Sequence, residues 1–189
     1  MRIATAALLA LAFADSAQAA AYTMDPAHTY PQFDIRHLDF STLHGQFNHT
    51  TGSITMDRKK NLGSVEATID VNSLATGDAA RDKDLKSPQF FDAAKYPTMT
   101  YKSTKVIFHG RDRATVEGDL TLRGVTRPVA LQVTRIHCGI SPILKKEVCG
   151  FDAVGRLKRS DFGMKAYLPV IPDKVKLVIN TDAVEDSAQ

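Results

Sequence analysis

Alternation of apolar and polar residues with a period of two dominates the sequence and limits the folds open to it. In one run, Phe33, Ile35 and His37 alternate with polar neighbours, and four further runs repeat the pattern. Successive side chains of a strand point to opposite faces, so each run predicts a strand with one buried and one solvated face. The further runs lie at residues 65–71, 99–103, 129–133 and 175–179.

Short turn signals separate these runs. Residues 57–61, 109–112 and 123–128 have the length of hairpin connections, so the strands that they join are expected to pair antiparallel. Residues 78–87 differ, because they are rich in charged residues and helix formers, and they predict a short helix before Pro88. A sheet of about eight strands with one helix must close or form a sandwich, and periodicity alone leaves that choice open.

The first residues have the pattern of a secretory leader. Arg2 precedes a short apolar run, and the sequence Ala17-Gln18-Ala19 then has the small-x-small form of a cleavage site. The run is too short to span a bilayer. The sequence therefore predicts a signal peptide over residues 1–19 and one secreted domain over residues 20–189.

The charge of the chain is mild and mixed. The formal net charge is +3, and the basic clusters at residues 111–113 and 158–159 have no aromatic residues between them. This pattern indicates a solvated surface and not a nucleic-acid partner, although a basic rim is able to steer anionic head groups toward an opening.

Cys138 and Cys149 are the only two cysteines, and they stand eleven positions apart. An oxidising compartment favours a disulfide between them. A redox or metal role would need a CxxC spacing or neighbouring ligands, and the sequence around the pair offers neither. We therefore interpret the pair as structural.

Large apolar side chains are more numerous than a two-layer core strictly needs. The chain has no Trp but nine Phe, five Met and five Tyr, spread over most of the expected strands. Flexible Met and flat Phe suit a pocket for a disordered tail, whereas each residue taken singly fits ordinary core packing equally well. Only the set as a whole indicates a cavity.

Four blocks of sequence, in order, resemble the YceI family of periplasmic polyisoprenoid-binding, lipocalin-like proteins. The blocks extend over nearly the whole expected mature chain. They are residues 33–41 (FDIRHLDFS) with 45–47 and Gly52, residues 81–92 (RDKDLKSPQFFD) with 95–97, residues 118–129 (GDLTLRGVTRPV), and Phe151 with residues 159–164 (RSDFGM).

The resemblance implies an all-β fold, an eight-stranded antiparallel lipocalin-like barrel with one short helix and an internal apolar tunnel. It also implies a periplasmic protein that binds a long-chain isoprenoid or similar amphiphilic lipid, such as a polyprenyl or quinone-type molecule. Two departures bear on head-group preference and not on the apolar set. Asp84 stands where many members carry His, and the loop between Cys138 and Cys149 is not a general family feature.

The candidate polar chemistry favours structure over catalysis. Four histidines, His28, His37, His44 and His49, lie in the N-terminal quarter, but their spacing lacks an HxH or HxxxH pair, so no metal site is predicted. Neither a nucleophile elbow nor a marked carboxylate pair is present, so no enzyme activity and no cofactor are expected. Two structural roles are expected: an ion pair between Arg81 and Asp82 that holds the helix over the barrel mouth, and a turn at residues 160–163 capped by Ser or Asp. Direct contact with a ligand is the open alternative for both segments.

The predicted ligand is therefore an isoprenoid or quinone-type lipid, and two other functions remain open. One is a quinone-linked accessory of a membrane redox protein, and the other is a stress-induced interaction module without a physiological lipid. Homodimer formation and transient contact with a membrane or a membrane redox protein are further open partner hypotheses. The residues predicted to line the tunnel are Phe33, Ile35, His37, Phe40, Phe47, Met99, Tyr101, Phe162 and Met164.

Overall fold

The computed structural model describes residues 19–186, and strands make up most of them. The predicted leader therefore lies outside the described residues, apart from Ala19. Two 3₁₀-helices and one α-helix interrupt the strands. The elements are β1 (Ala20–His37), β2 (Ser41–Phe47), β3 (Thr50–Asp57), β4 (Leu62–Asp70), η1 (Val71–Ser73), β5 (Leu74–Ala75), α1 (Ala79–Leu85), β6 (Thr98–His109), β7 (Arg113–Leu122), β8 (Val125–Ile140), β9 (Glu147–Lys158), η2 (Arg159–Phe162) and β10 (Lys174–Glu185).

The strands form a closed antiparallel barrel. Eight of them follow the order β10-β9-β8-β7-β6-β4-β3-β1, and pairing of β1 with β10 closes the ring. Strand β3 pairs with the first residues of β1, and β2 pairs with the second half of β1, so β2 extends the line of β3 toward one end of the barrel. The short strand β5 pairs with β2 and extends the line of β4 in the same way. Closure pairs the backbone groups between strands and leaves a barrel instead of a sandwich, which confirms the predicted fold.

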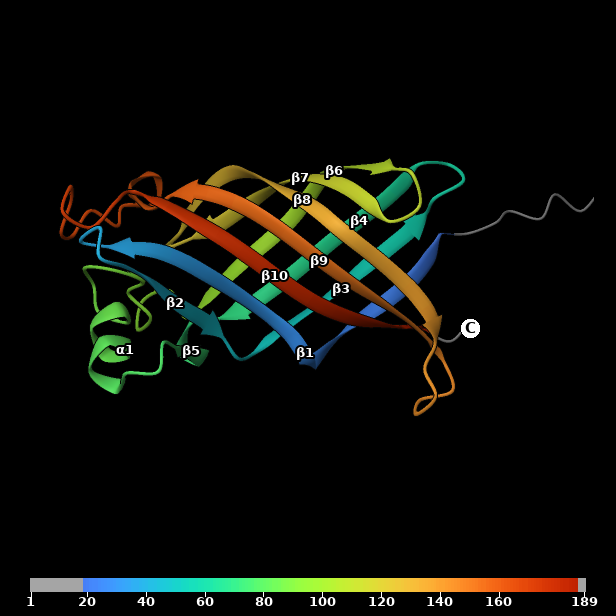
Figure 1. Ribbon diagram of the computed structural model, residues 1–189, viewed down its shortest axis with the longest axis horizontal. Coiled ribbons are helices and arrows are strands. Elements are labelled where there is room, and N and C mark those ends of the chain that lie inside the picture. The colour runs from blue at the N-terminus through green and yellow to red at the C-terminus, as the bar shows by residue number, and fades with distance from the viewer. Residues whose placement is uncertain (1–18, 187–189) are drawn as a thin grey trace, which may run out of the picture.

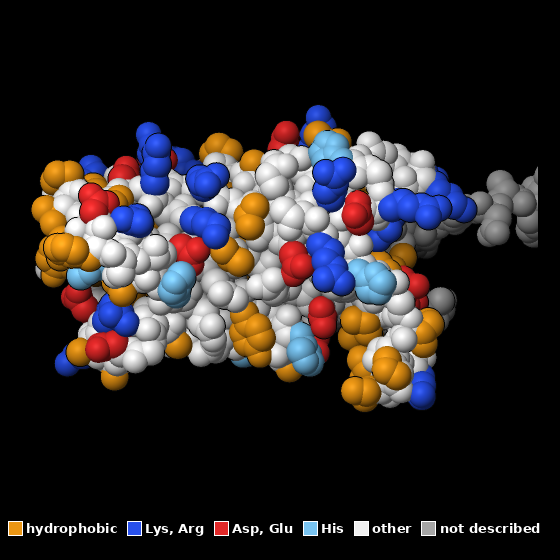
Figure 2. Space-filling model, in the orientation of Figure 1, with side chains coloured by type: hydrophobic (Ala, Val, Ile, Leu, Met, Phe, Trp, Pro, Cys, Tyr) orange, Lys and Arg blue, Asp and Glu red, His pale blue; other side chains and the backbone are white. Residues whose placement is uncertain are grey.

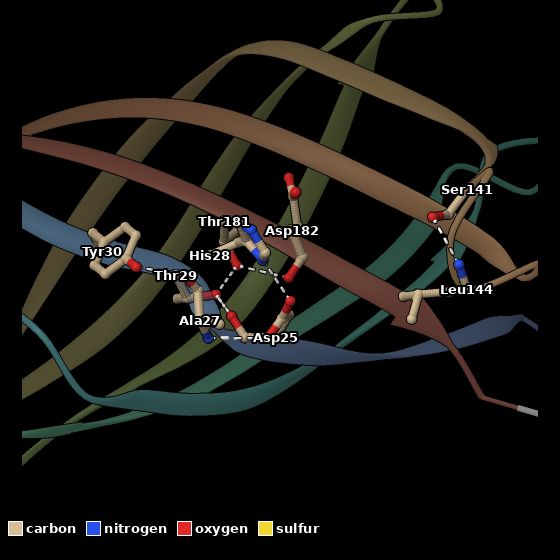
Figure 3. Close-up of polar contacts among 9 residues, drawn as sticks. All are labelled: Asp25, Ala27, His28, Thr29, Tyr30, Ser141, Leu144, Thr181 and Asp182. Carbon is tan, nitrogen blue, oxygen red and sulfur yellow. Dashed lines mark hydrogen bonds and ion pairs between the residues drawn. The ribbon is translucent and has the colours of Figure 1, made fainter.

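A bulge of several residues divides β1 into two halves. The register with β10 shifts between Met24 and Thr29, so the residues between them face a shorter stretch of the partner strand. Figure 3 shows how this segment is held: Asp25 accepts hydrogen bonds from the His28 ring and from the Ala27 amide. The Thr29 hydroxyl donates to the Asp25 carbonyl and lies 2.7 Å from the Thr181 hydroxyl. The bulge therefore bends β1 without leaving these hydroxyls unpaired.

The connection between β7 and β8 is tighter than predicted. Arg123 and Gly124 alone form the turn, both with positive φ (54° and 71°), as a type I′ hairpin requires. Leu122 pairs with Val125 directly beyond them. The prediction of a six-residue connection is therefore wrong, since β8 begins four residues earlier than the apolar alternation indicated.

The single α-helix lies where it was predicted but is shorter. Asp78 caps its start, because its carboxylate accepts a 2.8 Å hydrogen bond from the Arg81 amide. The helix ends at Leu85, before Pro88. Figure 1 places α1 at one end of the barrel, near the end of β1 in this view. None of the helices in residues 19–186 has the length and apolar character needed to cross a bilayer.

The two ends of the barrel differ in construction. We call the end that carries α1, the β1–β2 turn and the loop of residues 163–173 the open end (Figure 1). The opposite end, with the β3–β4, β6–β7 and β8–β9 turns, is the far end. An apolar cluster fills the far end, and it consists of Tyr22, Met24, Ile54, Met56, Cys149 and Ala183.

Candidate binding cavity

A cavity of about 760 Å³ extends along the inside of the barrel. Inward side chains from all eight barrel strands line it, and nearly all of them are apolar. Leu131, Leu157 and Leu177 are only half-buried although they point inward, because part of each side chain faces this space. The cavity ends against Met24 and Met56 of the far-end cluster. Its volume lies within the range of small-molecule sites in proteins.

Three phenylalanines form an aromatic cluster in the cavity wall near the open end. The Phe47 and Phe91 rings meet edge to face with centroids 5.5 Å apart, and Phe33 lies 6.1 Å and 6.2 Å from them. Gly45 is the cross-strand partner of Phe33, and a Cβ atom there would lie 2.3 Å from the Phe33 ring. The Phe33 ring is therefore able to lie against β2 only because position 45 has no side chain.

Tyr101 brings a hydroxyl into the wall without offering it to a guest. Its oxygen donates to the backbone carbonyls of Val129 (3.1 Å) and Val116 (3.3 Å), and the side chain is buried. Burial, with the charges of Asp119 and Glu117, raises the pKa of this phenol well above its usual range. The hydroxyl stays neutral and paired, so it acts as part of an apolar wall.

Polar side chains gather where the cavity opens. His37, His44, Thr76, Arg81 and Asp84 belong to the lining there, and Asp84 is exposed to solvent. A guest with an apolar tail inside the barrel would thus place its head group among these residues. Sequence patterns indicated His37, Arg81 and Asp84 individually, whereas nothing in the sequence singled out Thr76.

Thr76 joins α1 to the barrel. Its amide (2.8 Å) and hydroxyl (2.6 Å) donate to the Asp82 carboxylate, and Arg81 donates to its hydroxyl and carbonyl at 2.9 Å each. The predicted Arg81–Asp82 ion pair is therefore not what holds the helix. Neighbouring helix residues point in different directions, so Arg81 and Asp82 do not pair with each other. Each of them forms hydrogen bonds with Thr76 instead.

Arg159 organises the loop on the other side of the opening. Its guanidinium donates to four backbone carbonyls, those of Met164, Ala166, Ile171 and Pro172, at 2.8–3.0 Å. The residue is 4% exposed, and burial lowers the pKa of the guanidinium. Sequence reasoning missed this role, because the carbonyl groups that bind a buried arginine leave no pattern of side chains.

The structure places seven of the nine predicted tunnel residues in the cavity lining. They are Phe33, Ile35, His37, Phe47, Met99, Tyr101 and Met164. Contact with a ligand stays a prediction for all seven. The position of the six strand residues on the inner face of the barrel follows from the strand register, whereas Met164 lies in the loop after η2. The alternation therefore located the wall correctly wherever the residue lies in a strand.

Phe40 and Phe162 are corrections to that prediction. Phe40 is 88% exposed and lies outside the cavity, because Leu38 and Asp39 take positive φ and end the alternation of β1. Phe162 is 1% exposed but belongs to η2, where it packs into the core and does not line the cavity. Gly163, with φ of 80°, terminates η2, so the predicted turn at residues 160–163 is present as a short helix, but the predicted cap by Ser or Asp is wrong, because the residue at its N-cap forms no capping hydrogen bond through its side chain.

The cysteines and histidines take structural positions. Cys138 and Cys149 form the predicted disulfide, between directly opposed residues of β8 and β9. His28 binds Asp25, and His44 binds Asp34 at 2.7 Å. Within residues 19–186, the one group of three side chains close enough to hold a metal ion contains both disulfide cysteines, whose sulfur atoms are already bonded.

Comparison with known proteins gives the family. The YceI-like domain model matches residues 22–183, which extend from β1 to β10. Protein YceI of Escherichia coli O157:H7 is 40% identical over 187 residues, with 94% of this chain and 97% of that protein covered. The chain belongs to the YceI family.

Two solved structures support the same fold for this YceI family member. Burkholderia cenocepacia BcnA has a TM-score of 0.75 at 24% identity, over 84% of this chain and 98% of that one. A polyisoprenoid binding domain from Saccharophagus degradans has a TM-score of 0.63 at 18% identity, over 87% of this chain and 98% of that one.

Proposed function

We propose that this YceI family member binds a long-chain isoprenoid or similar amphiphilic lipid in the barrel, carries it through the periplasm and catalyses no reaction on it. The observation that carries the proposal is the continuous, mostly apolar cavity whose charged and histidine side chains lie around its opening. Such an arrangement matches a molecule with a long apolar tail and a small polar head.

The free energy of hydration explains why such a molecule needs a container. Each CH₂ group that leaves water contributes about 0.8 kcal/mol, so a long prenyl tail does not stay dissolved as a monomer. The cavity wall is mostly apolar, and the hydroxyls of Tyr101, Thr29 and Thr181 within it are already paired, whereas the buried Thr50 hydroxyl has no hydrogen-bond partner among residues 19–186. A tail inside the barrel therefore meets no unpaired donor or acceptor from the three paired hydroxyls.

Two polar side chains near the cavity support the proposal that the protein catalyses no reaction. A general acid or base must hold a proton near the reacting atoms with a pKa near the working pH. Tyr101 is fixed in its neutral form by burial, and the Arg159 guanidinium is engaged by backbone carbonyls. The remaining polar groups at the opening, such as Arg81 and Asp84, are suited to orient a head group.

Extraction of the native protein provides the first test. The full chain of residues 1–189 is produced, purified without detergent and extracted with organic solvent for mass spectrometry. We expect an isoprenoid or another long amphiphile in about equal molar ratio to the protein. Repeated extracts without any long-chain lipid, from protein that also fails to bind added prenyl lipids, would overturn the proposal.

Two neighbouring residues of β10 provide a matched pair of variants. Ile179 lines the cavity, whereas Val178 points to the opposite face of the strand. An Ile179→Trp substitution fills part of the cavity and should weaken lipid binding about tenfold, the effect of excluding about two CH₂ groups. The same substitution at Val178 should leave affinity within about twofold of the wild type. Equal affinity in both variants would place the ligand outside the barrel.

A further inference from the structure

Two loops at the open end expose large apolar side chains outside the barrel. Leu38 and Phe40 lie in the β1–β2 turn, and Tyr167 and Val170 lie in the loop of residues 163–173. Phe40 is 88% exposed, and the other three are more than a third exposed. Figure 2 shows apolar side chains gathered over this end. Single exposed apolar residues are ordinary, but four on adjoining loops form a patch.

The strand register brings the two loops together. Asp34 of β1 pairs with Lys176 of β10, so the residues that follow β1 and those that precede β10 leave the barrel side by side. Figure 1 shows the two loops next to each other at the open end. The patch therefore joins segments that are far apart in the sequence.

Hydrogen bonds fix both loops in the positions that expose these side chains. In the turn, the Phe40 amide donates to the His37 carbonyl (2.9 Å) and Arg36 donates to the Asp39 carbonyl (2.8 Å). In the loop, the Ile171 amide donates to the Tyr167 carbonyl at 2.8 Å. The Arg159 guanidinium holds four further carbonyls. The exposed apolar groups are thus preorganised, so little conformational entropy is lost when a surface covers them.

The patch is continuous with the cavity. Leu38, Tyr167 and Val170 belong to the cavity lining as well as to the outer rim. The far end also exposes apolar side chains, among them Ile143 at 87%, but Leu62, Ile140, Ile143 and Leu144 are absent from the lining of this cavity. Among residues 19–186, only the open end therefore offers an apolar path from outside the barrel to its interior.

The geometry points to a phospholipid bilayer as the partner of this patch, with Phe40 and its three neighbours inserted into the interfacial layer. The inference rests on the proposed function, because a lipid guest must leave a membrane and return to one. A lipid that crosses water between the bilayer and the barrel exposes its CH₂ groups to water, and each exposed group costs free energy. If the rim of the barrel is inserted in the bilayer, the lipid passes between the two without this exposure. A protein partner would shield the same surface but would not supply the guest.

The charges of the open end define the kind of bilayer. Residues 36–40 carry one basic and one acidic group, residues 78–86 carry three of each, and residues 163–173 carry one of each. These three segments are thus balanced in charge, and the Arg123 guanidinium of the β7–β8 turn at the same end donates to the Pro88 and Phe90 carbonyls, so the gain from anionic lipids is small. Docking is driven by insertion of apolar side chains, so it should occur on zwitterionic phosphatidylcholine and depend weakly on salt.

The absence of tryptophan from the whole sequence allows a direct measurement. Phe40→Trp and Ile143→Trp each introduce a single fluorophore, at positions of nearly equal exposure on opposite ends. With phosphatidylcholine vesicles, the emission of Trp at position 40 should shift to shorter wavelength, and that at position 143 should stay unchanged. Addition of phosphatidylglycerol or salt should change vesicle affinity by less than about threefold. A shift at position 143 alone, at both positions or at neither overturns the inference.

A second pair of variants separates docking from cavity binding. Phe40→Ser should reduce vesicle binding about tenfold in a flotation assay, and Ile143→Ser should leave it within about twofold. Phe40 lies outside the cavity lining, so Phe40→Ser should retain the co-purified lipid and the melting temperature. Retained lipid without vesicle binding by the wild type overturns docking alone. Vesicle binding without a lipid in the barrel overturns the proposed function alone. Unaltered vesicle binding by Phe40→Ser would also overturn the inference and leave the patch to a protein partner.

Discussion

The open and far ends of the barrel solve the same problem, the closure of a hollow sheet, in different ways. At the far end, side chains of the apolar cluster fill the space, and the disulfide joins β8 to β9. At the open end, segments outside the strands surround the opening, and they are held by bonds from Arg159, Arg81 and Asp82 to backbone and hydroxyl groups. The comparison indicates that the far end sets the depth of the cavity, whereas the open end controls access.

Substitution of Arg159 at the open end should produce the largest change in the free energy of unfolding. Arg159→Met keeps the length of the side chain but leaves four buried or part-buried carbonyls without their donor, so the free energy of unfolding should fall by about 3–5 kcal/mol. Hydrogen exchange should increase first in residues 163–173. Denaturant unfolding measures the loss, and exposed Arg156 of β9, changed to Met, is the control with an effect below about 0.5 kcal/mol. An equal effect of the two substitutions would show that the loop does not depend on the guanidinium.

Loss of the disulfide should destabilise the far end and leave the open end intact. Reduction of the Cys138–Cys149 bond, which spans eleven positions, should lower the free energy of unfolding by about 3 kcal/mol. Lipid affinity should change by less than about threefold, because neither cysteine lines the cavity. Unfolding with and without reductant measures the first value, and a Cys138→Ala/Cys149→Ala variant should show no further response to reductant. A loss of lipid binding as large as that of Ile179→Trp would contradict separate roles for the two ends.

The sequence predicted the wall of the barrel better than its ends, for a physical reason. Within a strand, side-chain direction follows from alternation, so Phe33, Met99 and Tyr101 were placed on the inner face correctly. Phe40 was misplaced because two residues with positive φ precede it, and local composition does not show where a strand ends. The role of Arg159 depends on carbonyls of a loop that follows it, and a carbonyl is the same at every position. Closure by β1 and β10 joins the two ends of the domain, so only the family resemblance indicated it.

The smallest expected effect concerns Asp173, which holds the start of η2 at the open end. Its carboxylate accepts hydrogen bonds from the amide (2.8 Å) and hydroxyl (2.7 Å) of Ser160. Burial raises the pKa of this carboxyl, but the Ser160 hydrogen bonds and the charges of Arg159 and Lys158 outweigh it, so the pKa lies below its usual value. A carboxyl with a lowered pKa stabilises the folded state above the pKa of the unfolded chain, about 4, and this contribution disappears as the pH falls through the folded value.

Asp173→Asn should therefore cost about 1 kcal/mol of unfolding free energy at neutral pH, and its difference from the wild type should shrink toward zero in acid. Parallel denaturant titrations of the two proteins from neutral pH to below about pH 3 measure this convergence. Asp161→Asn, on the exposed side of the same short helix, is the control and should show a smaller difference at neutral pH. A difference that stays constant over the whole pH range would mean that Asp173 contributes through its shape and not through its charge. At the far end, apolar packing and a disulfide add stability that does not titrate in this range, whereas the Asp57 carboxyl at the β3–β4 turn also has a lowered pKa, because Lys60 donates hydrogen bonds to it.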